Sequence, residues 1–263
     1  MIKKGEGICE DAFFLLNNAA GVSDGVGGWS EFGIIPSFFS QSLMRNCSHI
    51  IKQSSEYIAP DLVLSQAYER TTFSGGGTAL ICVLNDHQLS CANVGDSRFL
   101  LIRFDDKKQP YVVLQSSVQR HAFNAPYQLT NVPSPEEILC NLRENLISAD
   151  ELAKKLIKYK NLELYKDLPE TAQLYQINVQ EDDLVVLATD GLFDNLFLEE
   201  ILESIRKVVN GRICSEVPPK EIADVIANYA HNRSKSLDEN SPFSEEYREN
   251  EGVMQMVIFS FLE

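Results

Sequence analysis

The chain of 263 residues is 44% hydrophobic, so it has enough apolar side chains to bury a core, and this excludes intrinsic disorder as the default. Its formal charge of −15 disfavours nucleic acid and anionic membrane surfaces as partners, because both need patches of Lys and Arg. The six cysteines form no CxxC pair and the four histidines are scattered, so zinc-type spacing is absent, and no stretch reaches transmembrane length.

Apolar alternation and β-branched residues predict strands along much of the chain. The predicted ranges are Ala12–Leu16, Ala19–Ser23, Thr78–Asn85, Gln88–Val94, Arg98–Phe104, Tyr111–Gln115, Leu174–Val179, Asp183–Thr189 and Val253–Phe261. Most of these strands follow one another through short turns, which indicates antiparallel sheet.

Helical patterns interrupt the strands in pairs. The first predicted pair is Pro36–Gln53 and Asp61–Thr72. The second is indicated by two apolar stripes, one at Ile201, Leu202, Ile205, Val208 and Val209 and one at Ile222, Val225, Ile226 and Tyr229. Sheets with segregated helix pairs favour an α+β layered domain over a doubly wound one.

The middle of the chain has a different pattern. Two capping boxes, Ser134–Glu137 and Ser148–Glu151, predict two short helices inserted between strands. The inserted lobe is interpreted either as a partner-binding element or as a neutral surface insertion. Further on, the polar and charged stretch Ser234–Asn250 is predicted to be a mobile loop.

Two segments far apart in the sequence have the same pattern, an apolar run that ends in Asp-Gly. Asp24-Gly25 ends one run and Asp190-Gly191 ends the other, so each is expected to place a carboxylate at the end of a buried strand. Two acidic strand ends suit a dinuclear Mg²⁺ or Mn²⁺ site, because hard cations take oxygen ligands. The metal-site hypothesis depends on Asp24 and Asp190 sharing the two ions.

Three motifs each have two interpretations. Glu10-Asp11 before a strand is either a metal-binding pair, with one acid acting through a water, or a solvated turn. Asp96 lies either in a two-residue turn between strands or at the rim of the metal site. The glycines of Asp24–Trp29 form either an exposed functional loop or a corner packed by Trp29.

Two other motifs are predicted to have structural roles. The run Gly75-Gly76-Gly77-Thr78 lacks the GxxxxGK[ST] pattern of a phosphate-binding loop. We therefore predict a bend between a helix and a strand. Asp194 is expected to cap the N-terminus of a helix.

In this order the motifs resemble those of the type 2C metal-dependent protein Ser/Thr phosphatases, in the branch found in mitochondria and plastids. The similar segments are Asp24–Trp29, Phe32-Gly33 through Pro36-Ser37, Leu43-Met44-Arg45, Phe123–Leu129 and Ala188–Asn195. The resemblance implies an α-β-β-α sandwich of two antiparallel sheets flanked by helix pairs. It implies a single phosphatase-like domain over residues 1–263, with a helical insertion at about 131–160. The N-terminal edge strand of the family is missing from this domain, so one sheet is expected to lack a partner strand.

The resemblance also implies a reaction, the hydrolysis of phosphoserine or phosphothreonine on a phosphoprotein by a metal-activated water. Two Mg²⁺ or Mn²⁺ ions are expected, and a third is held by some members. A mitochondrial location is implied by the resemblance alone, and the oligomeric state is left open. The implied roles are as follows: Asp24 bridges both metals, the Gly25 carbonyl binds one, Asp190 binds the other, Glu10 binds through water, Asp11 supports the site, and Asp96 matches the third-metal position.

Three positions depart from the family pattern. The last-strand position that usually holds a metal-ligating Asp is Gly252, and the side chain of neighbouring Glu251 turns to the other face of a strand unless a bulge intervenes. Val26 stands where many members have a His, and the organellar branch shares this difference. The Arg that binds substrate phosphate in the family has no match near Glu6. The alternatives are an active phosphatase, a pseudophosphatase that serves as a binding or scaffold module, and a trimmed product that folds poorly.

Overall fold

The computed structural model describes residues 9–144, 148–160, 165–236 and 240–250. The chain divides into two compact units, one comprising Met1–Ser97 and Pro126–Val179 and the other Arg98–Ala125 and Gln180–Glu263. Both units contain an antiparallel sheet and helices, which confirms the α+β fold class. The strand predicted at residues 253–261 and the substituted position 252 lie outside the described residues.

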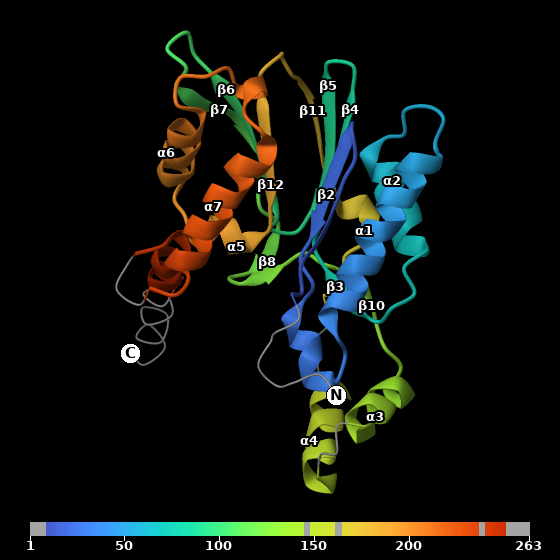
Figure 1. The fold of residues 1–263 in the computed structure, drawn as a ribbon. Coiled ribbons are helices and arrows are strands. Elements are labelled where there is room, and N and C mark those ends of the chain that lie inside the picture. The colour runs from blue at the N-terminus through green and yellow to red at the C-terminus, as the bar shows by residue number, and fades with distance from the viewer. Residues whose placement is uncertain (1–8, 145–147, 161–164, 237–239, 251–263) are drawn as a thin grey trace, which may run out of the picture. The chain divides into compact units, whose positions relative to one another are not determined.

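The first unit is built on a sheet whose described strands pair in the order β1-β2-β4-β5-β11, all antiparallel. Helices α1 (Pro36–Gln53) and α2 (Pro60–Glu69) lie side by side over this sheet (Figure 1). Proline begins both helices, where its missing N–H breaks no helical hydrogen bond. The strands are β1 (Ala12–Leu15), β2 (Ala19–Ser23), β4 (Ala79–Asn85), β5 (Gln88–Val94) and β11 (Gln173–Asn178).

The core of the first unit lies between α1, α2 and one face of this sheet. Phe39, Leu43 and Cys47 repeat every four residues along α1 and are fully buried. They share a cluster with Leu64 of α2 and Ile81 of β4. The same spacing predicted α1 from the sequence, because residues four apart lie on one face of a helix.

A second cluster of the first unit involves the loop after β2. The 3-10 helix η1 (Gly27–Phe32) packs against α3 (Pro135–Glu144) and α4 (Ala149–Lys160). Both predicted capping boxes have their serine bonds, since the hydroxyls of Ser134 and Ser148 accept hydrogen bonds from amides three residues later. A short 3-10 helix, η2 (Pro169–Thr171), precedes β11.

The three-glycine run is a strand, so the predicted bend is wrong. The strand β3 (Gly75–Gly77) pairs with β10 (Leu129–Asn131) in antiparallel register. A Cβ at Gly77 would lie 2.7 Å from the carbonyl oxygen of Asp24, and one at Gly76 would lie 2.9 Å from Gln128 Oε1. Side chains at positions 76 and 77 would therefore collide with neighbours that are distant in sequence, and the local sequence does not reveal these neighbours.

The second unit contains a sheet whose described strands pair in the order β12-β6-β7. Residues from this sheet and from the helices α6 and α7 form one buried cluster, including Leu100, Ile102, Ile205 and Ile226. The interpretation of Asp96 as part of a hairpin turn is wrong, because the strands on either side of it belong to different sheets. The elements are β6 (Arg98–Phe104), β7 (Pro110–Gln115), β8 (Arg120–Ala122), β12 (Leu184–Ala188), α5 (Asp190–Phe193), α6 (Leu198–Val209), η3 (Cys214–Glu216) and α7 (Pro219–Arg233), and β8 pairs with the two-residue β9 (Ala125–Pro126).

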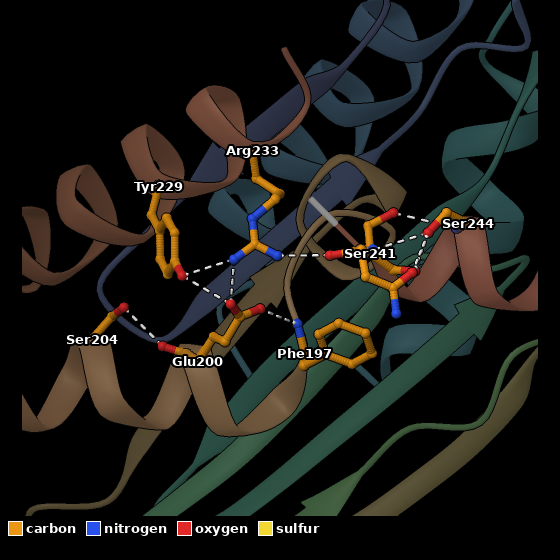
Figure 2. A network of polar contacts seen from close by, with 8 residues as sticks. Phe197, Glu200, Ser204, Tyr229, Arg233, Ser241 and Ser244 are labelled. Atoms are coloured by element: carbon orange, nitrogen blue, oxygen red, sulfur yellow. Dashed lines mark hydrogen bonds and ion pairs between the residues drawn. The ribbon is translucent and has the colours of Figure 1, made fainter. Parts of the chain in front are cut away.

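A polar network joins α6 to α7, as Figure 2 shows. Glu200 accepts hydrogen bonds from the Phe197 amide at 2.9 Å and from the Tyr229 hydroxyl at 2.8 Å, and it forms an ion pair with Arg233. Burial raises the pKa of Glu200, but these three donors outweigh it and hold the pKa below its ordinary value. The carboxylate is therefore more stable in the folded unit than in water.

The mobile loop predicted over Ser234–Asn250 is wrong for its later part, where residues 242–250 are helical. The Ser241 hydroxyl accepts the Ser244 amide at 3.2 Å, as in a helix cap. The rings of Phe243 and Tyr247, four residues apart, lie 5.4 and 6.0 Å from the ring of Phe123. Phe243 and Tyr247, two aromatic residues in a polar stretch, therefore pack this segment against Phe123. Among the helices that the structure describes, none is both long and apolar enough to cross a membrane.

Candidate metal centre

Asp24 stands directly after β2, and its backbone is bonded to Thr78. The Asp24 amide donates to Thr78 Oγ1 at 3.0 Å, and the Asp24 carbonyl accepts the Thr78 amide at 2.9 Å. Thr78 Oγ1 also lies 2.8 Å from Ser97 Oγ. Thr78 and Ser97 are buried, so these bonds hold the Asp24 backbone in one position.

Gly25 brings the segment of Glu10 against the segment of Asp24. The Gly25 amide donates to the Glu10 carbonyl at 3.1 Å, and a Cβ at position 25 would lie 2.8 Å from the carbonyl oxygens of Glu10 and Pro36. Only glycine fits in this space. A Cβ at Gly27 would lie 2.8 Å from Glu10 Oε2, so the Glu10 carboxylate reaches the loop that follows Asp24.

The strand register also places Asp11 opposite Asp24. Ala12 pairs with Ser23, and the bond between Gly25 and Glu10 continues the same antiparallel register by two residues. Asp11 and Asp24 therefore form a non-hydrogen-bonded pair, the kind in which facing side chains are closer. Burial and then the charge of Asp11 raise the pKa of Glu10 above its ordinary value. The register thus brings Glu10, Asp11 and Asp24 to adjacent strand ends of the first unit.

Asp96 follows β5 in the first unit and is only 2% exposed. The preceding Gly95 has a φ of 104°, and a Cβ there would lie 2.7 Å from Thr78 Cγ2 and from the Tyr127 carbonyl oxygen. The next residue, Ser97, accepts a hydrogen bond from Asn93 Nδ2 on its carbonyl at 2.9 Å. Asp96 is therefore a buried acid in a tightly bonded loop, unlike a residue of a solvated turn.

Asp190 belongs to the second unit, where it begins α5 one residue after β12, with Thr189 between them. It is half-buried, and its carbonyl accepts the Asp194 amide at 2.8 Å. Asp194 is the C-cap of α5, and the N-cap of α6 is Phe197, so the predicted N-cap role of Asp194 is wrong. Its carboxylate instead lies 3.9 Å from Arg120 Nη2, and its carbonyl accepts the Phe243 amide at 3.1 Å.

Arg120 is a residue of this region that sequence reasoning missed. Its guanidinium nitrogen Nη1 donates to both carboxylate oxygens of Glu246 at 2.8 Å. The two residues are 126 positions apart, so no local pattern reveals the pairing. Arg120 connects the end of α5 to the helical residues 242–250 within the second unit.

The residues have the chemistry of a site for hard cations, because carboxylate and carbonyl oxygens are the ligands that Mg²⁺ and Mn²⁺ prefer. Within either unit, however, the described His, Cys, Asp and Glu side chains gather in no group of three or more that could hold a metal ion. Asp24 and Asp190 belong to different units. That these two residues share metal ions therefore stays a prediction.

Comparison with known proteins shows the family. The model of the protein phosphatase 2C family matches residues 34–124. The protein phosphatase PTC7 homolog of Homo sapiens is 33% identical over 257 residues, which cover 93% of this chain and 74% of the human protein. The chain belongs to the protein phosphatase 2C family. The probable protein phosphatase 2C 80 of Arabidopsis thaliana is 34% identical over 239 residues, which cover 89% of this chain.

The chain spans about half or less of two curated Arabidopsis relatives, 48% of protein phosphatase 2C 80 and 28% of protein phosphatase 2C 62. Among solved structures, the photosystem II phosphatase PBCP is 29% identical with a TM-score of 0.70, covering 92% of this chain and 79% of that one. The Mycobacterium tuberculosis phosphatase PstP/Ppp has a TM-score of 0.53 at 16% identity, covering 87% of this chain and 88% of that one, and this likeness shows the fold alone.

Proposed function

We propose that this protein is an Mg²⁺- or Mn²⁺-dependent phosphatase that hydrolyses phosphoserine and phosphothreonine on proteins. Membership of the protein phosphatase 2C family supports the reaction class. The observation that carries the proposal for this chain is the bond from the Gly25 amide to the Glu10 carbonyl, which aligns Glu10 and Asp11 with Asp24. Adjacent acids on fixed backbone suit a divalent cation, since fixing the ligands in advance lowers the entropic cost of binding.

The proposed roles are those that the family resemblance implies. Asp24, the Gly25 carbonyl and Glu10 would hold metal ions from the first unit, with support from Asp11. Asp190 would provide a ligand from the second unit, and Asp96 would bind a third ion. When bound, the ions lower the pKa of a water and neutralise charge on the phosphoryl oxygens.

The glycines and hydroxyl groups of this chain would serve the same site. Thr78 and Ser97 hold the backbone of Asp24 and the loop of Asp96 through one hydrogen-bonded chain. Gly25 and Gly27 leave room for Glu10 to approach the Asp24 loop. Gly25 is buried in this contact, whereas Gly27 leaves exposed backbone in the loop that follows Asp24.

We also propose that residues 1–263 act as one phosphatase-like domain, with the segment at about 131–160 as an insertion. A mitochondrial location is proposed on two grounds. The motifs resemble those of the organellar branch, and several relatives carry the name PTC7 homolog.

The test is hydrolysis of a phosphothreonine peptide with Mn²⁺, comparing the wild type with Asp190→Asn. Mn²⁺ is a reasonable probe because the catalytic domain of PstP, with a TM-score of 0.50 at 17% identity, was solved with 2 manganese ions. Asp224→Asn is the matched control, since Asp224 is an exposed acid of α7 paired with Lys220. We expect Asp190→Asn to lower kcat by about 100-fold or more and Asp224→Asn to leave it unchanged. Equal activity of the wild type and Asp190→Asn would sink the enzyme proposal.

The alternative is a pseudophosphatase, and Gly252 is the observation that favours it. Loss of one carboxylate weakens a metal site because ligand charge sets affinity. Calorimetric titration with Mn²⁺ separates the two functions. Two binding events support the enzyme, one weak event supports a scaffold with a single metal, and an unfolded baseline supports a trimmed product.

A further inference from the structure

Two cysteines stand directly opposite each other in the sheet of the first unit. The strands β4 and β5 are neighbours in this sheet (Figure 1), and their antiparallel register pairs Cys82 with Cys91. Residues paired across a sheet point to the same face, so the two thiols are adjacent. Ile81 and Val83, on either side of Cys82, belong to the cluster packed under α1 and α2. Both cysteines therefore lie on the face turned away from these helices.

Backbone hydrogen bonds show which kind of pair the cysteines form. On the side of β2, the Leu84 amide donates to the Asn18 carbonyl at 2.7 Å. On the side of β11, the amide directly after that strand donates to the His87 carbonyl at 2.8 Å. Alternate residues of an antiparallel strand direct their backbone groups to alternate neighbours, so Cys82 bonds toward β2 and Cys91 toward β11. Between β4 and β5 the two cysteines therefore form a non-hydrogen-bonded pair.

This kind of pair has the separation that a disulfide bond needs. The Cα atoms of a non-hydrogen-bonded pair lie about 4.5 Å apart. Disulfide-linked cysteines have Cα separations of about 4.4–6.8 Å. The thiol of Cys82 already makes a hydrogen bond with Cys91. A covalent bond between the two sulfurs therefore needs no change in the register of the strands.

The other four cysteines lie in four different parts of the chain. Cys9 precedes β1, and the remaining three belong to different helices, with Cys47 in α1, Cys140 in α3 and Cys214 in η3. Cys9 and Cys140 are exposed. The pairing of cysteines across a strand register is therefore specific to positions 82 and 91 among the described strands.

Burial limits which oxidants can reach this pair. Cys82 is 3% exposed and Cys91 is fully buried. Burial, and then the hydrogen bond with Cys91, raise the pKa of the Cys82 thiol well above its usual range. The thiol is therefore mostly protonated near neutral pH and reacts slowly, because thiolate is the reactive form. A suitable oxidant is a peroxide, which is small enough to enter during local opening of the sheet.

We propose that Cys82 and Cys91 are a redox site, at which hydrogen peroxide forms an intramolecular disulfide bond that joins β4 to β5. The thiolate of one cysteine attacks the peroxide, which gives a sulfenic acid and hydroxide, and the proton of that thiol converts the hydroxide to water. The second cysteine then attacks the sulfenic sulfur, which forms the S–S bond and releases another water. Two thiols and one peroxide thus give one disulfide and two waters. The second step is fast because the two sulfurs are already adjacent.

The disulfide joins two strands that lead to the candidate metal centre. Thr78, which bonds the backbone of Asp24, directly precedes β4, and Asp96 follows β5 after one residue. The redox site is thus built into the hairpin that positions two of the proposed ligands. Its chemistry does not depend on the proposed catalysis, so the tests follow the thiols and not the activity.

The first test maps the cysteines of the whole chain by mass spectrometry. Iodoacetamide blocks the exposed Cys9 and Cys140 of the folded protein, and hydrogen peroxide is then added. After denaturation in urea, N-ethylmaleimide labels every thiol that remains. We expect the peptides of Cys82 and Cys91 to be joined by a disulfide that dithiothreitol reduces, and Cys47 to carry the maleimide. Labelling of Cys82 and Cys91 like Cys47, or their oxidation without a bond between them, would overturn the proposal.

The second test compares the folded chain with the unfolded chain and with two variants. Peroxide treatment in urea is expected to give mixed disulfides among the unblocked cysteines, and the same mixture from the folded protein would rule out a preformed pair. Cys82→Ala is expected to leave Cys91 as a free thiol. Cys47→Ala is the matched control, since Cys47 is also buried in the first unit, and is expected to form the disulfide at the wild-type rate. If Cys82→Ala does not fold, the mapping of the wild type still decides the question.

Discussion

Asp24 and Thr78, 54 positions apart, exchange two hydrogen bonds, from the Asp24 amide to Thr78 Oγ1 at 3.0 Å and from the Thr78 amide to the Asp24 carbonyl at 2.9 Å. Thr78 Oγ1 also lies 2.8 Å from Ser97 Oγ, next to Asp96. One hydroxyl group therefore connects the backbone of one candidate metal ligand with the loop of another. This relationship makes Thr78 a positioning residue and leads to the first prediction.

We predict that Thr78→Val destabilises the protein by about 1–2 kcal/mol, because the Asp24 amide and Ser97 hydroxyl each lose a buried partner. Valine has nearly the same shape, so packing changes little. Urea denaturation measures the loss, and Thr78→Ser, which keeps the hydroxyl, is the control. Unfolding midpoints that do not differ between Thr78→Val and wild type would show that these bonds are energetically neutral.

Gly27 and Gly28 provide a matched pair that tests the position of Glu10. A Cβ at Gly27 would lie 2.8 Å from Glu10 Oε2, whereas a Cβ at Gly28 meets nothing within 4 Å. Both substitutions change the backbone entropy of η1 similarly, so their difference reports the contact. We predict that Gly27→Ala displaces the Glu10 carboxylate and weakens Mn²⁺ binding by about tenfold in calorimetry, while Gly28→Ala binds like the wild type. Equal Mn²⁺ affinities would contradict a ligand role for Glu10.

Glu200 makes the stability of the second unit depend on pH. Its pKa is lowered in the folded unit from the ordinary value of 4.5, so the unfolded chain binds a proton more readily. The stabilisation is therefore present above pH 4.5 and is lost as the pH falls through the lowered pKa. We predict that Glu200→Gln costs about 2 kcal/mol near pH 7 and that this cost shrinks in acid.

The measurement for Glu200 is urea denaturation followed by circular dichroism at a series of pH values. Glu199→Gln, at an exposed neighbouring position of α6, is the control and is expected to match the wild type. A cost of Glu200→Gln that stays constant between pH 7 and the acid range would refute the linkage to its carboxylate.

The cluster around η1 allows the stability contributed by apolar packing to be compared with that contributed by a surface ion pair. Phe32 is 3% exposed, with its ring 5.4 Å from that of Tyr159, while the pair of Glu31 and Lys158 has side chains 54% and 57% exposed. We predict that Phe32→Ala costs about 3 kcal/mol and Lys158→Ala less than about 1 kcal/mol. The fluorescence of Trp29, the single tryptophan of the chain, reports unfolding of this cluster. Similar losses from both substitutions would show that the ion pair matters more than its exposure indicates.

Several elements could be predicted because their signals are local. The bounds of β2, β5, β6 and α1 agree with the sequence prediction, and the serine bonds of both capping boxes are present. Periodicity and capping act over a few residues, so the sequence itself contains them. The acids Glu10, Asp24 and Asp190 could likewise be proposed from strand ends and family motifs. Their joint use of metal ions remains a prediction.

By itself the sequence determined the alternation of strands and helix pairs, the family motifs and the glycines that follow each acid, since each of these depends on neighbouring residues. Only the tertiary structure decided that Gly75–Gly77 is a strand, that Thr78 bonds Asp24 and that Arg120 pairs with Glu246. These features join residues tens of positions apart, and their free energy comes from burial and close contact, which no short stretch of sequence encodes.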